Sequence, residues 1–389
     1  MTMNVLWLAL ATFAIGTEAL VIAGLLPTIA ADLQISAPAA GQLVTAYSLA
    51  YAIGSPVLAV LFHNVDRKTV LILALVCFIA SNLLAVVAPG FPLLMVSRVL
   101  MALGAGLCTP TAIGVSVAIA PPERRGRAVA LVTSGLTVAT VVGVPLGTVV
   151  GNQISWRATF LMVAGLGVFA LAGIVLRLPR NLPRHTSSLS ERLAVARHPG
   201  VLIALVTTTL WAIGAMSVFA YLAVPLHGIG FGAAEVSFAL FLFGVAAAVG
   251  NISGGMLADH FGPVPTSAIA LAGMATAQFL LSALLKSTHS GDFTHYLVLL
   301  PMICWAACGW GFFPAHSTNI IRAEPHAAQI ALSLNYSAMY LGFAIGGALG
   351  GIVLSTLGPA NLGWVGAASA SMGLAVLLLL VRRERLQTA

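Results

Sequence analysis

Long apolar runs recur along this chain, and short polar breaks separate them. A helix needs about 20 predominantly apolar residues to cross the hydrocarbon core of a bilayer. Twelve segments meet this length, and they lie near residues 5–31, 39–62, 69–89, 92–119, 127–150, 157–178, 200–225, 234–257, 264–285, 294–319, 329–353 and 361–381. The pattern predicts an all-α membrane protein with twelve transmembrane helices.

One polar stretch is much longer than the others, and it divides the helices six and six. It covers residues 180–199 and reads RNLPRHTSSLSERLAVARHP. We expect an N-terminal bundle over 1–179, a linker over 180–199 and a C-terminal bundle over 200–389. Within the linker, Ser190 to Arg197 could form a short surface helix, which Ser188 or Ser190 could cap.

Composition supports a membrane location and excludes several other classes. Hydrophobic residues make up 60% of the chain and charged residues only 7%, whereas soluble domains carry about 25% charged residues. The first apolar run lacks a basic leader and a cleavage pattern, so we expect it to be retained as a span. No Walker sequence, metal-ligand cluster or Ser/His/Asp set is recognisable. We therefore expect that the protein is neither an ATP-driven pump nor an enzyme, and that it binds no cofactor and no metal.

The positions of the basic residues predict the orientation in the membrane. Of the 17 Lys and Arg residues, 14 lie on one side of the predicted membrane. They follow helices 2, 4 and 10, lie in the linker or just before it at Arg177, or belong to the C-terminal tail. Even-numbered breaks share one side, and Lys and Arg accumulate on the cytoplasmic side. We expect both termini and the linker to be cytoplasmic in a bacterial inner membrane. The net charge of +7 therefore reflects topology and not a nucleic-acid partner, and we expect a monomer.

The two halves of the chain resemble each other. Leu26–Pro27 in the first helix corresponds to Val224–Pro225 in the seventh, at a shift of 198 residues. Gly54 and Gly250 begin similar breaks after helices 2 and 8, and GVPLG in helix 5 corresponds to GGALG in helix 11. These matches occur in the same order in both halves and are separated by nearly the same number of residues, which indicates a duplication. Transporters built from such repeats place the substrate site near the bilayer midplane.

Two ionisable residues lie at depth in the predicted spans. Glu18 follows an uncharged stretch in the first helix, and Arg98 lies inside the fourth. Such residues usually face a bundle interior or a water-filled cavity, and they often mark an ion or substrate path. Burial disfavours the charged form of a carboxyl group, so a proton and a substrate could compete for Glu18. Arg98 could pair with Glu18, bind an anionic substrate or bind backbone carbonyls. Asp32 is either a proton relay or a solvated residue at the helix end.

Several local patterns resemble the major facilitator superfamily, specifically its twelve-span drug:proton antiporter branch. They are GTEALVIAGLLPTIAADL in helix 1, SRVLMALGAG in helix 4, Gly135 with GVPLG in helix 5, WRATF from Trp156, and the breaks after helices 2 and 8. The first break keeps the basic pair of the family's loop pattern, Arg67 and Lys68, but has His63 where the acid would align. The second keeps Asp259 and lacks the basic pair. The resemblance implies proton-coupled efflux, with Arg67, Lys68 and Asp259 as gating residues.

Two stripes of glycine run along helices 5 and 11. They comprise Gly135, Gly143, Gly147 and Gly151 in helix 5, and Gly342, Gly346 and Gly350 in helix 11. Glycine at this spacing permits close approach between helices. We expect the two stripes to form the contact between halves that closes one side of the membrane, with Pro145 adding a kink.

The predicted substrate cavity has a mostly apolar, aromatic wall. Its candidate residues are Tyr47, Tyr51, Trp211, Phe219, Trp305, Phe312, Asn335, Tyr336 and Met339. Such a lining suits a lipophilic or amphipathic drug. An exporter of small metabolites, such as sugars or purine nucleosides, is the first alternative, and a membrane sensor without transport is the second. Glu18 argues against the sensor, which has no need of a buried titratable group.

Overall fold

The computed structural model describes residues 2–179, 182, 189–287 and 293–388, and in these residues every regular element is helical. The first half contains α1 (Thr2–Asp32), α2 (Ala37–Leu61), α3 (Arg67–Val86), α4 (Phe91–Ile119), α5 (Arg125–Val138), the π-helical segment η2 (Ala139–Gly143), α6 (Val144–Gln153) and α7 (Trp156–Arg177). The second half contains α9 (Pro199–Phe219), α10 (Ala223–Gly228), α11 (Ala233–Phe261), α12 (Pro263–Ser287), α13 (Leu299–Ala323), α14 (Ala328–Thr356) and α15 (Leu362–Thr388). Between them lies α8 (Leu189–Arg197).

These elements make twelve helices that are long and apolar enough to cross a membrane. The fifth span combines α5, η2 and α6, and the seventh combines α9 and α10; each of the other ten contains one α-helix. The predicted fold class, with twelve spans in two six-helix halves, is therefore confirmed. The predicted linker helix is also present as α8, although its possible cap Ser188 lies outside the described residues.

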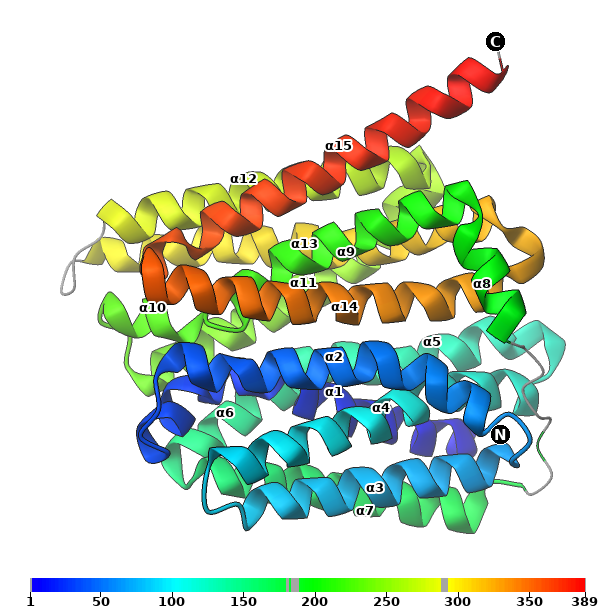
Figure 1. Cartoon of the computed structure of the whole chain (residues 1–389), viewed down its shortest axis with the longest axis horizontal. Helices are drawn as coiled ribbons and strands as arrows, with labels where there is room; N and C mark the ends of the chain where they lie inside the picture. The colour runs from blue at the N-terminus through cyan, green and yellow to red at the C-terminus, as the bar shows by residue number, and fades with distance from the viewer. Residues whose placement is uncertain (1, 180–181, 183–188, 288–292, 389) are drawn as a thin grey trace.

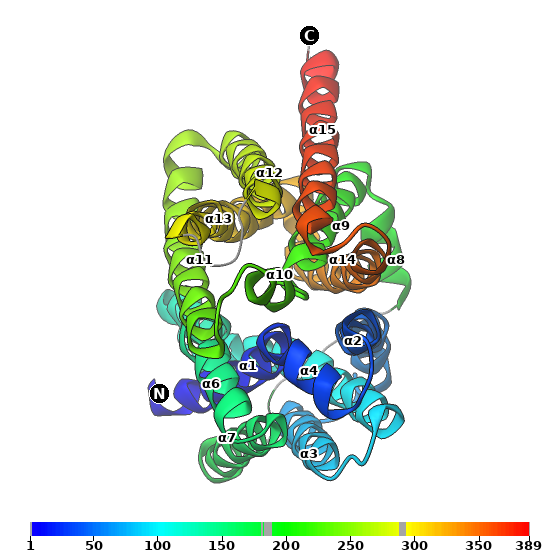
Figure 2. The ribbon, with the colours of Figure 1, turned by 90° about the vertical axis from the view of Figure 1, so that its left-hand side faces the viewer.

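The spans form two bundles that lie side by side (Figure 1). We call α1 to α7 the N half and α9 to α15 the C half. The α2–α3 connection, α8 and the two chain ends lie on the right of Figure 1, at what we call the terminal face. The α1–α2, α6–α7 and α10–α11 connections lie at the opposite face, which Figure 2 views end-on.

Proline accounts for two breaks in the spans. A proline lacks the backbone N–H group, and its ring crowds the carbonyl four residues earlier. In the seventh span, Pro225 therefore excludes a regular helix at Tyr221, and the Tyr221 carbonyl accepts from the Val224 N–H at 2.9 Å. In the fifth span, the π-helical segment η2 ends two residues before Pro145. The expected irregularity at Pro145 is thus a π-helical turn.

The two halves touch from the middle of the spans to the opposite face. Packing joins α2 to α14, α11 to η2 and α6, and α10 to α1. A Cβ atom on Gly347 of α14 would lie 3.0 Å from Thr45 Oγ1 of α2. On the other flank, Gly244 of α11 lies directly against the backbone of Thr140. Figure 2 shows α10 between the two bundles at the opposite face.

The expectation that the two glycine stripes meet each other was wrong. Each stripe packs against a helix of its own half: Gly143 against Thr17 of α1, and Gly346 against Ile213 of α9. The same holds for Gly135, Gly147 and Gly151, which face α1 and α7, and for Gly342 and Gly350, which face α9 and its continuation. The stripes therefore hold each bundle together, and the contact between halves uses other residues.

Candidate functional site

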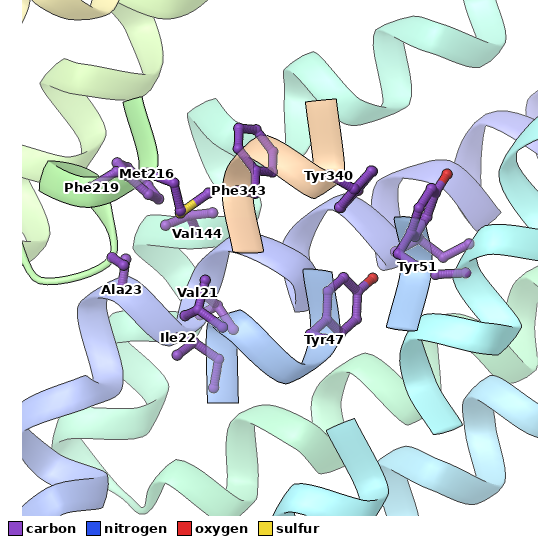
Figure 3. Packing of buried hydrophobic residues seen from close by; sticks show 14 of the residues in the cluster. Val21, Ile22, Ala23, Tyr47, Tyr51, Val144, Met216, Phe219, Tyr340 and Phe343 are labelled. Carbon is purple, nitrogen blue, oxygen red and sulfur yellow. The ribbon is translucent and has the colours of Figure 1, made fainter. Parts of the chain in front are cut away.

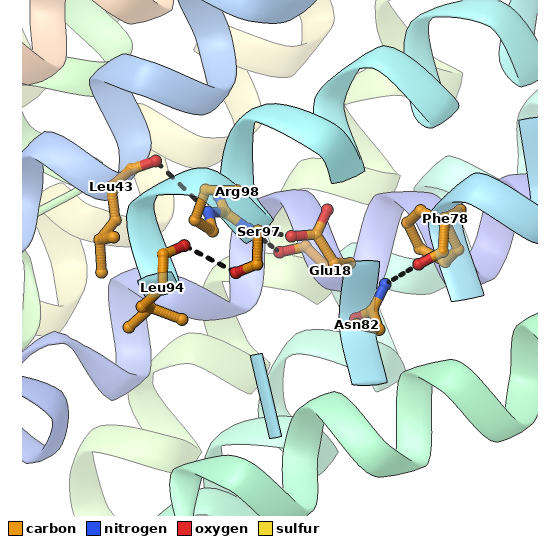
Figure 4. Close-up of polar contacts among 7 residues, drawn as sticks. All are labelled: Glu18, Leu43, Phe78, Asn82, Leu94, Ser97 and Arg98. Carbon is orange, nitrogen blue, oxygen red and sulfur yellow. Dashed lines mark hydrogen bonds and ion pairs between the residues drawn. The ribbon is translucent and has the colours of Figure 1, made fainter. Parts of the chain in front are cut away.

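The centre of the N half contains a buried ion pair between Glu18 and Arg98. Both side chains have 0% exposure, and Arg98 Nη1 donates to Glu18 Oε1 (Figure 4). Arg98 also donates from Nη1 to the Glu18 carbonyl at 3.4 Å and from Nε to the Leu43 carbonyl at 3.3 Å. The guanidinium thus links α1, α2 and α4. Of the roles considered for Arg98, the structure shows the pairing with Glu18 together with backbone contacts.

Part of the hydrogen-bonding capacity at this pair is unused. Glu18 Oε2 and Arg98 Nη2 are buried and have no hydrogen-bond partner among the described residues. The Arg98 guanidinium also lies 4.3 Å from the ring centroid of Tyr47 in α2, a distance suited to a cation–π interaction. Buried polar atoms without a partner are costly and rare. The two at this pair therefore mark the Glu18–Arg98 cluster as a candidate functional site of the N half.

Asp32 belongs to a different network. Its Oδ2 accepts hydrogen bonds from Arg157 Nη1 at 2.7 Å and from Trp156 Nε1 at 2.9 Å. Arg157 Nη2 in turn donates to the Ala88 carbonyl at 3.1 Å. Asp32 thereby ties the ends of α1, α3 and α7 together at the opposite face. Fourteen residues of helix, about 21 Å at 1.5 Å per residue, separate it from Glu18, so the structure does not bring the two acids together.

An aromatic cluster joins the halves next to the ion pair (Figure 3). The ring of Tyr51 stacks on Tyr340 of α14 with centroids 3.6 Å apart, and the ring of Tyr47 lies 6.3 Å from Tyr340. Sequence analysis identified Tyr47 and Tyr51 but missed Tyr340. Helical spacing was the available signal, because Tyr340 lies one turn beyond the predicted Tyr336 on the same face.

A small cavity of about 30 Å³ lies between the C half and α1. Three predicted residues line it, Trp211, Phe219 and Trp305. Its remaining lining residues, which sequence analysis did not select, are Leu20, Ala215, Met216, Phe243, Gly309, Trp310 and Phe343. The only side-chain nitrogen or oxygen atoms in this set are three indole N–H groups, which donate hydrogen bonds and cannot accept them.

Six of the nine predicted cavity residues do not line this cavity, and two of them, Tyr47 and Tyr51, belong to the aromatic cluster between the halves. The ring of Phe312 stacks on Trp211 with centroids 5.4 Å apart, and its side chain is fully buried. Asn335 accepts a hydrogen bond from Thr208 Oγ1 at 2.6 Å, inside the C half. Tyr336 lies beside another ring of α13, and Met339 is buried in α14. Of these four, Phe312 supports the aromatic wall through its stacking on Trp211.

Two of the predicted gating residues, Arg67 and Lys68, make their described contacts within the N half. Lys68 Nζ donates to the carbonyls of Val175 at 2.8 Å and Leu178 at 2.6 Å, and so caps the end of α7. Arg67 lies beside Gly114 of α4. Asp259 is exposed near the end of α11. Their gating role stays a prediction, which rests on the family pattern and not on a contact between halves.

Two six-helix halves that enclose a mid-span site define the architecture of a secondary transporter. The family model described as Major Facilitator Superfamily matches residues 8–232 and 212–389. The chain therefore belongs to this superfamily of membrane transporters.

Relatives along most of the chain agree with this assignment. The uncharacterized MFS-type transporter YbcL of Bacillus subtilis is 32% identical over 384 residues, covering 98% of this chain and 97% of YbcL. The inner membrane transport protein YdhP of Escherichia coli K12 is 31% identical, covering 97% of this chain and 95% of YdhP. A chloramphenicol resistance protein of Streptomyces lividans is 33% identical over 271 residues, 68% of each chain.

Solved structures show the same fold. A D-xylose–proton symporter superposes with a TM-score of 0.81 at 17% sequence identity, over 97% of both chains. A peptide transporter gives the same TM-score at 13% identity, over 99% of this chain and 95% of its own. At these identities the likeness concerns the fold alone.

Proposed function

We propose that this transporter is a proton-coupled antiporter that exports lipophilic or amphipathic compounds by alternating access. The observation that carries the proposal is the Glu18–Arg98 pair, fully buried in mid-span beside the aromatic cluster that joins the halves. Proton binding neutralises Glu18 and releases Arg98 from its ion pair. The energy of the pair then depends on protonation, so a proton can bias the arrangement of α1, α2 and α4.

The cavity lining supports the substrate class. Its walls are aromatic or aliphatic, which favours an apolar ligand body. Trp211 Nε1 is buried without a hydrogen-bond partner in the part of the chain that the structure describes. Because the lining offers donors and no strong acceptor, it suits compounds that carry carbonyl, nitro or ether oxygens. The relative named as a chloramphenicol resistance protein supports export of such a compound.

The proposed orientation places the terminal face in the cytoplasm of a bacterial cell, with the protein in the inner membrane. The positive-inside rule applied to 14 of 17 basic residues supports it. The proposed units are the N-terminal bundle over 1–179, the linker over 180–199 and the C-terminal bundle over 200–389.

The test is transport in proteoliposomes with an imposed pH gradient and a panel of neutral, cationic and anionic compounds, chloramphenicol among them. We expect uphill movement of at least one lipophilic compound together with substrate-evoked proton movement in the opposite direction. Accumulation of sugars or nucleosides instead would support the metabolite exporter. Substrate movement that ignores the pH gradient would contradict proton coupling.

A further inference from the structure

The side chain of Tyr221 fills the contact between the halves at the opposite face. Tyr221 lies in the break between α9 and α10, and its side chain is fully buried. Its hydroxyl donates to the Gly347 carbonyl of α14 at 2.8 Å. The C half therefore holds this ring in one orientation before any contact with the N half is counted.

The surface that receives the ring consists of glycines. A Cβ atom on Gly41 of α2 would overlap the Tyr221 hydroxyl and ring, and one on Gly351 of α14 would lie 2.7 Å from the hydroxyl oxygen. On the same side, a Cβ atom on Gly350 would lie 2.7 Å from the Tyr221 ring. Gly41 belongs to the N half, whereas Tyr221, Gly350 and Gly351 belong to the C half. The ring thus seats in a notch that only the absence of a side chain at Gly41 leaves open.

The local sequence explains why the tyrosine reaches this notch. Pro225 breaks the seventh span at Tyr221, four residues earlier. The break turns the chain so that α10 lies between the bundles and contacts α1 (Figure 2). In the repeat, Pro27 corresponds to Pro225, yet α1 continues as one helix through it. The break with its tyrosine is therefore a feature of the C half alone.

We propose that Tyr221 is the latch of the opposite face, a positioning residue that holds the halves together there when its ring occupies the Gly41 notch. The inference rests on the alternating access of the proposed function. Opening of the opposite face requires α2 to move away from the ring. Weakening the latch therefore shifts the population toward the state that is open at this face and closed at the terminal face.

The test measures distances between spin labels in a background without Cys77, Cys108, Cys304 and Cys308. One label pair spans the opposite face at the exposed positions Ile154 and Leu357, and the second spans the terminal face at Asn64 and His326. We expect Tyr221→Ala and Gly41→Ala each to lengthen the first distance and shorten the second. The ratio of open to closed populations at the opposite face should rise about tenfold, equivalent to about 1.4 kcal/mol.

Matched variants separate the latch from general damage. Gly165→Ala adds the same methyl group where nothing lies within 4 Å, so both distances should stay as in the wild type. Tyr221→Phe keeps the ring and loses only the bond to Gly347, so its shift should be smaller than that of Tyr221→Ala. In the double variant Gly41→Ala/Tyr221→Ala, the added methyl has no ring to displace, so the shift should be less than the sum of the single shifts.

Unchanged distances in Tyr221→Ala would overturn the latch. Lengthening at both faces would also overturn it, because a loosened bundle and not a rocked one would produce that pattern. The distances need no substrate, so the test stands apart from the transport assay. If the wild type exports substrate and the label distances do not change in Tyr221→Ala, the latch is overturned and the proposed export function stands. If the distances change and no export is found, the latch stands and the proposed export function is overturned.

Discussion

The charge balance inside the N half depends on two side chains, Glu18 and Arg98. Each has the other as its buried counter-charge, and removal of one partner of such a pair typically costs about 3–5 kcal/mol. The same dependence makes the pair responsive to a proton, because neutral Glu18 leaves Arg98 with backbone carbonyls and the face of Tyr47.

Glu18→Gln should abolish uphill export and preserve downhill substrate exchange. The amide resembles the protonated carboxyl in shape and charge, and exchange needs binding and rocking without net proton movement. The measurement compares pH-driven accumulation with counterflow in proteoliposomes. Glu123→Gln, at an exposed position between α4 and α5, is the control and should behave as the wild type. Full gradient-driven export by Glu18→Gln would remove Glu18 from the coupling mechanism.

Trp211→Phe tests the proposed recognition of hydrogen-bond acceptors. The variant keeps an aromatic ring in the cavity and loses a buried N–H group that has no partner in the described structure. A transported ketone should lose about fivefold to tenfold in affinity, about 1–1.4 kcal/mol for one hydrogen bond, whereas its hydrocarbon analogue should not. Trp364→Phe, at a ring 40% exposed outside the cavity, is the control. Equal losses for both ligands would show that Trp211 only fills space.

The sequence was sufficient to locate Glu18 and Arg98, because a charge in a long apolar run is conspicuous. It could not show that the two pair with each other, since 80 residues separate them and Arg98 had backbone carbonyls and substrate as other partners. Asp32 illustrates the same limit. Its partners Trp156 and Arg157 lie at the start of the sixth span, and only the packing of the bundle brings them to the end of α1.

At the scale of elements, glycine sets how closely the spans approach. Gly135 of α5 lies against the backbone of α1, where a Cβ atom would meet the Ala9 carbonyl and lie 2.9 Å from the Phe13 nitrogen. The expectation from sequence identified the stripe and its close packing correctly. It assigned the wrong partner, because spacing along one helix carries no information about which neighbouring helix the stripe faces.

Gly135→Ala should destabilise the protein more than an equivalent change elsewhere in a span. The methyl group would push α5 away from α1, and overpacking of this kind typically costs about 1–3 kcal/mol. Thermal unfolding of the purified protein in detergent measures the effect. Gly255→Ala in α11, with nothing within 4 Å, should leave the midpoint unchanged or raise it slightly. Equal midpoints for the two variants would mean that α5 and α1 are not in close contact.

For the molecule as a whole, topology follows from the number and order of the spans. The described residues contain twelve candidate spans, and this even number agrees with the start of α1 and the end of α15 lying at the same face. The apolar runs of a membrane protein are distinct enough for the sequence to predict all twelve. The direction of insertion depends on the loops, whose basic residues the translocation machinery reads.

A reporter that is active only in the periplasm should stay inactive when fused after Arg197, and a cytoplasmic reporter should be active there. The reason is the accumulation of basic residues at the terminal face. Fusion after Ile154, at the opposite face, is the control and should give the reverse pattern. Periplasmic activity after Arg197 would invert the proposed orientation.

The separation of the two sites has a consequence for how such a protein can diversify. Every contact described for the Glu18–Arg98 pair comes from α1, α2 and α4, whereas nine of the ten residues around the small cavity come from the C half, Leu20 being the exception. Under the proposed function, the two halves have different roles. The N half binds the coupling proton, and the C half supplies most of the surface that recognises the substrate. Substrate specificity can then evolve by substitutions in the C half while proton coupling in the N half is conserved. A chimaera that joins the N half of one relative to the C half of another should take its proton coupling from the first and its substrate specificity from the second.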